Sequence, residues 1–130
     1  MSEEQNVIVP VHQLLPEELF IIPIKQRPIF PGMVSPLIIT GKDFSSKVEN
    51  ILKKTTYLGL LIQRDIAEKA EDPDNLYNVG TAIKVIKSVN LPDGGLHLLI
   101  NSLQRFSIKK YTYQKPSLLA KVEYYPEPEI

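Results

Sequence analysis

Proline is the residue that most limits what this chain can fold into. The sequence of 130 residues contains 11 prolines and 6 glycines, and the prolines are spread along the chain rather than gathered in one segment. Proline has no backbone N–H and clashes with the preceding helical turn, so it interrupts long helices and central strands. We therefore expect short strands joined by defined turns, in one domain that buries its own core.

Composition excludes several kinds of chemistry. The chain has no cysteine, which rules out disulfides, thiol nucleophiles and thiolate metal sites. Its formal net charge is zero, and its N-terminus, Met1-Ser2-Glu3-Glu4, is acidic, unlike the basic start of a secretory signal. No apolar run approaches the roughly 20 residues of a membrane-spanning helix. We expect a soluble, cytoplasmic protein that does not contact membranes.

Short apolar runs predict the strands of a sheet. Pro36 lies inside one of these runs, which predicts that this strand is bulged or lies at an edge, because proline cannot donate to a ladder. The predicted strands cover residues 19–24, 34–40, 57–62, 79–89, 96–100, 106–109 and 118–124.

One amphipathic helix is predicted between the second and third strands. Asp43 is a suitable N-cap because its carboxylate can accept hydrogen bonds from the first backbone N–H groups. Lys53 and Lys54 suit the negative end of the helix dipole, and Thr55-Thr56 is expected to end the helix. The helix is expected to pack on the sheet through one apolar face, which carries Phe44, Val48, Ile51 and Leu52.

The segment Pro92-Asp93-Gly94-Gly95 is the clearest turn signal, because Asp-Gly and Gly-Gly supply the positive φ angles of tight hairpins. In the strand before this turn, alternation predicts one face with Ile83, Val85, Lys87 and Val89. No strand–helix–strand unit repeats along the chain. The fold is therefore predicted to be mainly β (α+β), a compact antiparallel pseudo-barrel with one packed helix.

No constellation of residues indicates catalysis or metal binding. The two histidines, His12 and His97, are far apart in the chain and lack partners at ligand spacing. His97 is expected to point outward from a strand. The sequence has neither a phosphate-binding loop nor a nucleophile motif, and its acidic stretch at residues 68–74 lacks the pattern of a calcium loop. We expect a binding domain with no catalytic residue, metal or cofactor of its own.

One stretch of the chain is basic. From Gly94 to Val122 there is no acidic residue, and aromatic residues alternate with the cations. Basic and aromatic residues together are typical of nucleic-acid binding, but lysines also protect exposed strands against aggregation. Net neutrality favours the second interpretation, so nucleic acid is not the expected partner. The basic residues are Arg105, Lys109, Lys110, Lys115 and Lys121.

Four short blocks of sequence occur in a defined order: Phe30-Pro31-Gly32-Met33, Leu76-Tyr77-Asn78-Val79-Gly80-Thr81, Leu91-Pro92-Asp93-Gly94 and Leu103-Gln104-Arg105-Phe106. In this order they resemble the N-terminal domain of Lon-type ATP-dependent proteases. The resemblance covers roughly residues 19–125. It departs from the family pattern at residues 25–28, where many members have Leu-Arg-Asp followed by valines.

The resemblance implies a PUA-like LON N-terminal domain that recognises unfolded or damaged polypeptides and contacts other domains and subunits of a Lon hexamer. Residues 1–18 are then a flexible leader, residues 19–125 the domain, and residues 126–130 the start of a linker in a longer protein. ATP and Mg²⁺ are expected only in an ATPase module, and cleavage in a Ser-Lys peptidase module, neither of which is in this chain. Alternatives are a stand-alone LON-domain protein, an RNA-binding module and a structural spacer.

The turn at residues 30–33 is the predicted substrate contact. Phe30, Pro31 and Met33 place large apolar groups on a rigid turn, which suits extended apolar segments of a client. The competing interpretation is that Phe30 and Met33 are ordinary core residues. A purely structural role is predicted for the turn residues Gly32, Pro92, Asp93, Gly94 and Gly95.

Overall fold

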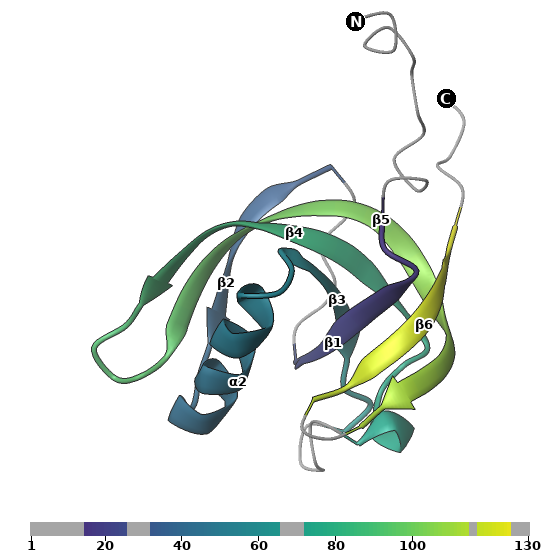
Figure 1. The fold of residues 1–130 in the computed structure, drawn as a ribbon, viewed down its shortest axis with the longest axis horizontal. Helices are drawn as coiled ribbons and strands as arrows, with labels where there is room; N and C mark the ends of the chain where they lie inside the picture. The colour runs from purple at the N-terminus through teal and green to yellow at the C-terminus, as the bar shows by residue number, and fades with distance from the viewer. Residues whose placement is uncertain (1–14, 26–31, 66–71, 115–116, 126–130) are drawn as a thin grey trace, which may run out of the picture.

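The computed structural model describes residues 15–25, 32–65, 72–114 and 117–125. This part of the chain forms six strands, one α-helix and a short 3-10 helix (Figure 1). Their bounds are β1 (Glu18–Ile24), β2 (Val34–Ile39), α2 (Lys42–Leu52), β3 (Tyr57–Ile62), η2 (Pro73–Asn75), β4 (Val79–Asn90), β5 (Leu96–Tyr113) and β6 (Leu119–Tyr124).

The strands form one sheet that closes on itself through β5. Their order is β2-β5-β4-β3-β1-β6, and β5 also pairs with β6. Among these strands β1 and β3 pair in parallel, and the other pairings are antiparallel. The predicted mainly β pseudo-barrel with one packed helix is confirmed.

The longest strand, β5, merges two strands that the sequence predicts separately. The predicted strands at 96–100 and 106–109 are parts of one strand of 18 residues, which bends across the molecule in Figure 1. The prediction of two strands was wrong because the polar residues between them do not break the ladder. Ser102 and Gln104 are buried within β5, and the Gln104 side-chain amide donates to the carbonyl oxygen of Tyr125.

Two hydrophobic clusters lie on opposite faces of β1 and β3. The first lies between α2 and the sheet and includes Val48 of the helix. The second surrounds Phe106 of β5 and extends to β6. Ile22 of β1 belongs to the first cluster and Ile21 to the second, so β1 is buried on both faces. This is why residues 19–24 form a continuous apolar run instead of alternating.

The predicted alternation of β4 is wrong beyond Val85. The register with β5 shifts between Ala82 and Ile83 and again between Val85 and Lys87. Ile83 and Val85 are buried, but Lys87 and Val89, predicted to share their face, are exposed. A bulge adds one residue to one strand, and a shift of one residue moves every later side chain to the other face.

Helix α2 begins earlier than predicted, because its N-cap is Gly41 and not Asp43. Gly41 has a φ of 90°, and its carbonyl oxygen accepts from the N–H of Ser45 at 2.9 Å. Asp43 instead lies in the first turn, where its carboxylate complements the positive end of the helix dipole. The helix ends at Leu52, before the predicted end at residues 55–56.

The turn at residues 92–95 joins β4 and β5 in a hairpin. The N–H of Leu91 donates to the carbonyl oxygen of Gly95 at 2.9 Å, and Gly94 has a φ of 92°. The Asp93 carboxylate accepts from the N–H of Gly95 at 3.0 Å. The positive φ explains the glycine, and the carboxylate holds the turn closed.

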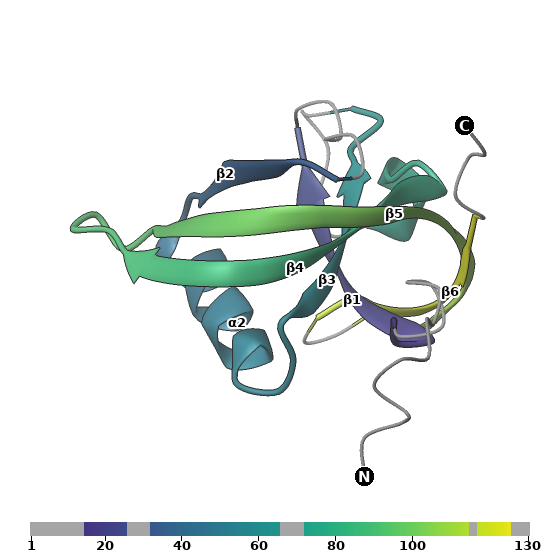
Figure 2. The same ribbon diagram turned by 90° about the horizontal axis from the view of Figure 1, so that it is seen from above.

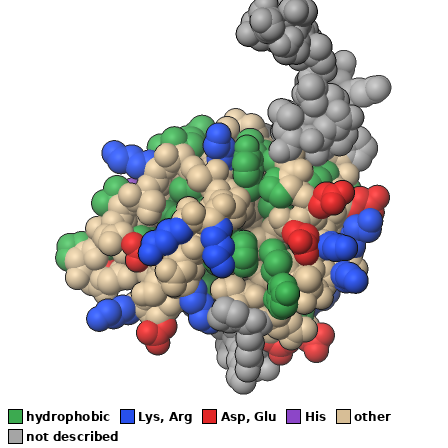
Figure 3. All heavy atoms as spheres, viewed as in Figure 1, with side chains coloured by type: hydrophobic (Ala, Val, Ile, Leu, Met, Phe, Trp, Pro, Cys, Tyr) green, Lys and Arg blue, Asp and Glu red, His purple; other side chains and the backbone are tan. Residues whose placement is uncertain are grey.

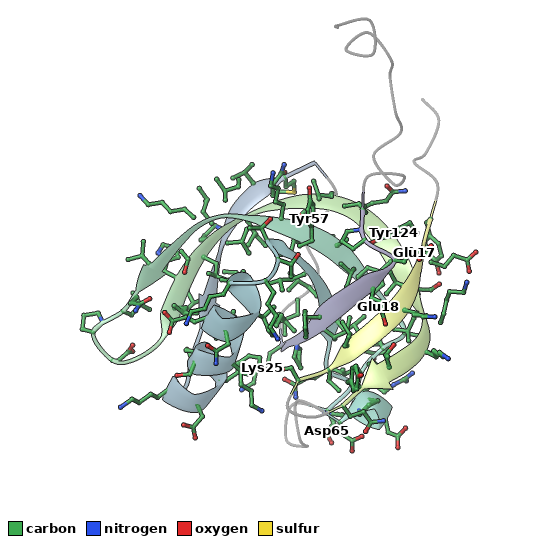
Figure 4. All side chains as sticks on the ribbon, viewed as in Figure 1. Glu17, Glu18, Lys25, Tyr57, Asp65 and Tyr124 are labelled. Atoms are coloured by element: carbon green, nitrogen blue, oxygen red, sulfur yellow. The ribbon has the colours of Figure 1, made fainter. Side chains whose placement is uncertain are left out.

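The residues just before β1 pack against the end of β6. Leu15 is buried, and the carbonyl oxygen of Glu17 accepts from the N–H of Val122 at 3.0 Å. The Tyr124 hydroxyl donates to the carbonyl oxygen of Pro16 at 2.6 Å, and Figure 4 shows Tyr124 beside Glu17. Residues 1–14 of the predicted leader and residues 126–130 of the predicted linker lie outside the described residues, and the domain boundaries stay a prediction.

Two tyrosines near β6 have raised pKa values. Burial raises the pKa of Tyr111 to about 12, from the usual value of about 10. Burial also raises the pKa of Tyr124. Among the described residues, the buried hydroxyl of Tyr111 has no hydrogen-bond partner. The folded state therefore holds both phenol protons more tightly than the unfolded chain does.

Gly80 should not tolerate a side chain, because β3 and β4 approach closely there. A Cβ at Gly80 would meet the backbone carbonyl oxygen of Leu60, whereas a Cβ at Gly59 would meet the Phe106 ring at 2.8 Å. We expect Gly80→Ala to lower the free energy of unfolding by about 1–3 kcal/mol. Gly59→Ala should cost less, because a ring can shift more easily than a ladder carbonyl. Urea unfolding of both variants checks this order, and a larger loss for Gly59→Ala would contradict it.

The buried tyrosines predict a loss of stability in alkali. Their contribution is complete below about pH 10 and falls as the pH rises towards 12, because the unfolded chain releases its phenol protons first. Tyr111→Phe should leave the unfolding free energy at pH 7 unchanged or higher, since it removes an unpartnered hydroxyl. It should also flatten the decline between pH 10 and 12. Chemical unfolding across this range, with the exposed Tyr113→Phe as control, tests the expectation; equal slopes for both variants would refute it.

Candidate binding surface

Strands β2, β5 and β4 present an exposed apolar face. Directly paired residues of neighbouring strands place their side chains on the same side of a sheet, so the register defines cross-strand rows. The rows are Val34 with Asn101 and Lys84, Pro36 with Leu99 and Lys87, and Ile38 with His97 and Val89. Together with two neighbouring residues they form the outer apolar face: Met33, Val34, Pro36, Ile38, Ile86, Val89 and Leu99.

The bulge in β4 supplies two of these side chains. Ile86 lies at the register shift and is 53% exposed. Without the register shift, Val89 would lie on the same buried face as Val85. Because of the shift, Val89 lies on the exposed face. Bulges that redirect side chains are over-represented near functional sites. A local irregularity of one strand therefore creates much of this face.

Helix α2 packs on the opposite side of the same strands. Val48 of the helix and Leu98 and Ile100 of β5 share the first hydrophobic cluster. In Figure 2, β2, β5 and β4 lie side by side in front of α2. Figure 3 shows hydrophobic side chains along the upper edge of the molecule, over these strands. Exposed apolar side chains that adjoin over several strands mark a contact surface.

The polar residues in the rows are basic or neutral. Lys84, Lys87 and His97 are exposed, and His97 points outward as predicted. The Lys84 ammonium lies 5.8 Å from the centre of the Tyr57 ring, close enough for a cation–π contact. The three rows contain no carboxylate. The face therefore suits apolar segments and does not repel acidic ones.

Strand β2 forms one edge of the described sheet, as Pro36 predicts. It pairs with β5 alone among the described strands. Pro36 has no N–H, so it removes a donor from β2. Two backbone hydrogen bonds hold the residues just before β2 against β5. The N–H of Gly32 donates to the carbonyl oxygen of Ser102 at 2.7 Å, and the N–H of Ser102 donates to the carbonyl oxygen of Met33 at 2.8 Å.

The predicted contact turn is described only in part. Phe30 and Pro31 lie outside the described residues. Met33 directly precedes β2 and is 48% exposed, so it is not a core residue. Gly32, with a φ of 90°, sets the direction of the chain entering β2. A contact role for Met33 stays a prediction, and its position next to Val34 extends the outer apolar face.

The basic stretch does not form a uniformly positive surface. Arg105, Lys109, Lys110 and Lys121 are exposed, while Lys115 lies outside the described residues. Glu18 of β1 pairs in register with Lys121, and Glu123 lies on the same strand as Lys121. Acidic and basic side chains are interspersed on the right of Figure 3. This mixture weakens the electrostatic case for nucleic acid.

Sequence reasoning missed most of the outer apolar face. In β2, both alternating sets contain large apolar residues, so the pattern does not tell which set faces the core. In β4, the bulge that exposes Val89 depends on pairing with β5, and the sequence of β4 alone does not predict it. The one available signal was Ile86, an isoleucine on the otherwise small or polar face of the predicted strand.

Neither a metal centre nor a membrane-spanning helix occurs among the described residues. In the part of the chain that the structure describes, no three His, Asp or Glu side chains come together as metal ligands would. The helices in those residues are too short or too polar to cross a lipid bilayer.

The fold and this face define a mainly β domain with an exposed apolar surface. The family described as the ATP-dependent protease La (LON) substrate-binding domain matches residues 18–130. A Lon protease of Leptospira interrogans is 42% identical over 126 residues, and one of Treponema pallidum is 34% identical over 124 residues. This chain belongs to the LON substrate-binding domain family.

The matched region is a small part of these relatives. It covers 97% of this chain and 15% of the Leptospira protein, and 95% of this chain and 14% of the Treponema protein. The chain thus corresponds to the substrate-binding domain of Lon proteases and spans about one seventh of the length of these relatives.

Solved structures show the same fold. The Lon N-terminal domain protein from Xanthomonas campestris aligns with a TM-score of 0.62 at 15% identity, over 84% of this chain and 60% of that one. The N-terminal domain of a Mycobacterium avium complex Lon protease aligns with a TM-score of 0.63 at 16% identity, over 87% of this chain and 57% of that one. The predicted family and fold are confirmed.

Proposed function

We propose that the outer apolar face binds extended apolar segments of unfolded polypeptides, and so selects substrates for a Lon-type protease. The proposal rests on the three cross-strand rows, to which each of β2, β5 and β4 contributes at least one exposed apolar side chain. Unfolded chains expose the apolar side chains that folded proteins bury, and burying them against a second apolar surface is favourable.

The expected affinity of one domain is low. Full burial of a side chain such as Val34, Ile38 or Ile86 contributes about 1.5–3 kcal/mol, and each of them is already partly covered. Ordering a flexible client costs part of this gain. The side chains of the face come from three strands, so it suits many client sequences. Weak and tolerant binding is what a receptor for damaged proteins requires.

The proposal extends to the assembly. Several copies of the domain in a ring would hold one long client at several points, which raises the effective affinity without stronger single sites. Other domains and subunits of a Lon hexamer are the partners we propose. ATP and Mg²⁺ would act in an ATPase module and cleavage in a peptidase module, as in a full-length protease. A cytoplasmic location belongs to the same proposal.

Binding should appear as NMR shifts on the outer apolar face. The probe is a polypeptide kept unfolded by reduction and neutral alkylation of its cysteines, added to the isotope-labelled chain. We expect shifts at Val34, Ile38, Ile86, Val89 and Leu99, because these side chains lose water on contact. No shifts at high probe concentration, or shifts confined to other surfaces, would refute the proposal.

Val89 and Val79 offer a matched pair of variants. Both are valines of β4, with exposures of 45% and 41%, but only Val89 belongs to the outer apolar face. Val89→Ser should weaken probe binding by about 0.5–1 kcal/mol, from the lost apolar contact, and Val79→Ser should leave it unchanged. Equal effects of the two variants would show that general surface hydrophobicity, not this face, drives binding.

Salt dependence separates this function from RNA binding. Association through apolar contacts should change little between low and moderate salt, whereas contacts with phosphates weaken steeply. Reversing the charge of Lys109 and Lys110 should leave probe binding intact. Loss of binding in that variant would move the function to the basic stretch.

A further inference from the structure

A concave surface lies between α2 and strands β1, β5 and β6, away from the outer apolar face. Its volume is about 450 Å³, within the range of about 300–1,000 Å³ typical of small-ligand pockets. In Figure 3, hydrophobic side chains gather near the centre of the view, between α2 and β6, with Lys and Arg side chains beside them. We call it the helix groove, and it is lined by Phe20, Lys47, Asn50, Ile51, Lys54, Tyr113, Ser117 and Leu119.

One wall of the helix groove is a polar stripe along α2 and the turn that follows it. Lys47 lies within α2, and Lys54 lies in the turn directly after the helix; both line the groove. Asn50 lies three residues after Lys47, so their Cβ atoms are about 5–6 Å apart on the helix. The three side chains supply donors to the same groove, two ammonium groups and one amide, so an anion in the groove has hydrogen-bond donors on this wall.

The opposite wall is apolar. Phe20 of β1 pairs in register with Leu119 of β6, which pairs with Tyr113 of β5. These three side chains form a cross-strand row that faces Ile51 of the helix side of the groove. Tyr113 is 61% exposed, so a large part of this wall is available to a ligand.

The two walls together specify the ligand. It must have one anionic group close to one apolar side chain, since the cations and the apolar row lie across a groove of small volume. A polypeptide has this combination at its C-terminal residue, where the α-carboxylate and the side chain share one Cα. The C-terminal end of a helix dipole does not favour anions, so the two lysines must supply the attraction.

We propose that the helix groove binds the C-terminal residue of client polypeptides when that residue is large and apolar. This inference rests on the proposed function that the domain binds polypeptides, and it adds a second contact with a different chemistry. The α-carboxylate lies over Asn50 between Lys47 and Lys54, and the side chain lies against Phe20, Leu119 and Tyr113. Clients that end in an apolar residue then engage two surfaces of one domain.

The test compares the short peptide Gly-Ser-Gly-Ser-Phe with a free C-terminus, the same peptide with a C-terminal amide, and one that ends in Ser. Titrations of the isotope-labelled chain follow the Asn50 side-chain amide and the methyl groups of Ile51 and Leu119. We expect shifts at these groups with the free acid, and binding weaker by at least about tenfold with the amide, because the charged hydrogen bonds are lost. The peptide ending in Ser should also bind more weakly.

Lys54 is exposed and Lys47 is partly buried. Lys54→Gln and Lys47→Gln should each weaken binding of the free acid by about threefold, as expected for a charge pair near the surface, and leave binding of the amide unchanged. Lys53→Gln is the matched control, because Lys53 adjoins Lys54 in sequence but does not line the groove. Equal binding of acid and amide, or an equal effect of Lys53→Gln and Lys54→Gln, would overturn the proposal.

The proposals for the helix groove and for the outer apolar face can be refuted separately. Val89→Ser should weaken binding of the long unfolded probe and leave binding of the short peptide unchanged. Lys54→Gln should leave the probe-induced shifts on the outer apolar face unchanged. Peptide shifts on the outer apolar face alone would refute the helix groove. Groove binding that persists while the long probe fails to bind would refute the proposed function of the outer apolar face instead.

Discussion

The backbone ladder of β5 is the interaction on which the rest of this domain depends. This single strand pairs with β2, β4 and β6, and it contributes to both hydrophobic clusters. Because one continuous strand spans both halves, the helix-covered half and the β6 half cannot move apart without breaking the ladder. The outer apolar face lies on one stretch of β5 and one wall of the helix groove lies near its end.

Much of the fold follows from local sequence patterns. Apolar runs located β1, β2, β3 and β6, and Asp93-Gly94 located the hairpin, because burial and turn geometry act over a few neighbouring residues. The N-cap was misplaced because Asp43 is a good cap by composition, whereas Gly41 has the backbone conformation at the helix start. The parallel pairing of β1 with β3 has no local signature, since β1 is apolar on both faces.

The candidate sites were harder to predict than the fold. A bulge in β4 is a property of two strands together, so no pattern within residues 79–89 alone could show that Val89 lies outside. The helix groove likewise joins Phe20, Asn50 and Leu119, which are far apart in sequence. The turn at residues 30–33 was predicted as the contact because it combines a rigid shape with large apolar side chains. Of its three predicted contact residues, Met33 is described, and it lies at the margin of the outer apolar face.

The proline in β2 has a consequence for how this domain behaves in a crowded assembly. An edge strand with apolar side chains is a template on which copies of the same chain can stack, strand by strand, into fibres. Pro36 cannot donate a backbone hydrogen bond, so it interrupts such growth in the middle of β2. The strand at the margin of the outer apolar face therefore carries its own interruption against the stacking of further copies of this chain.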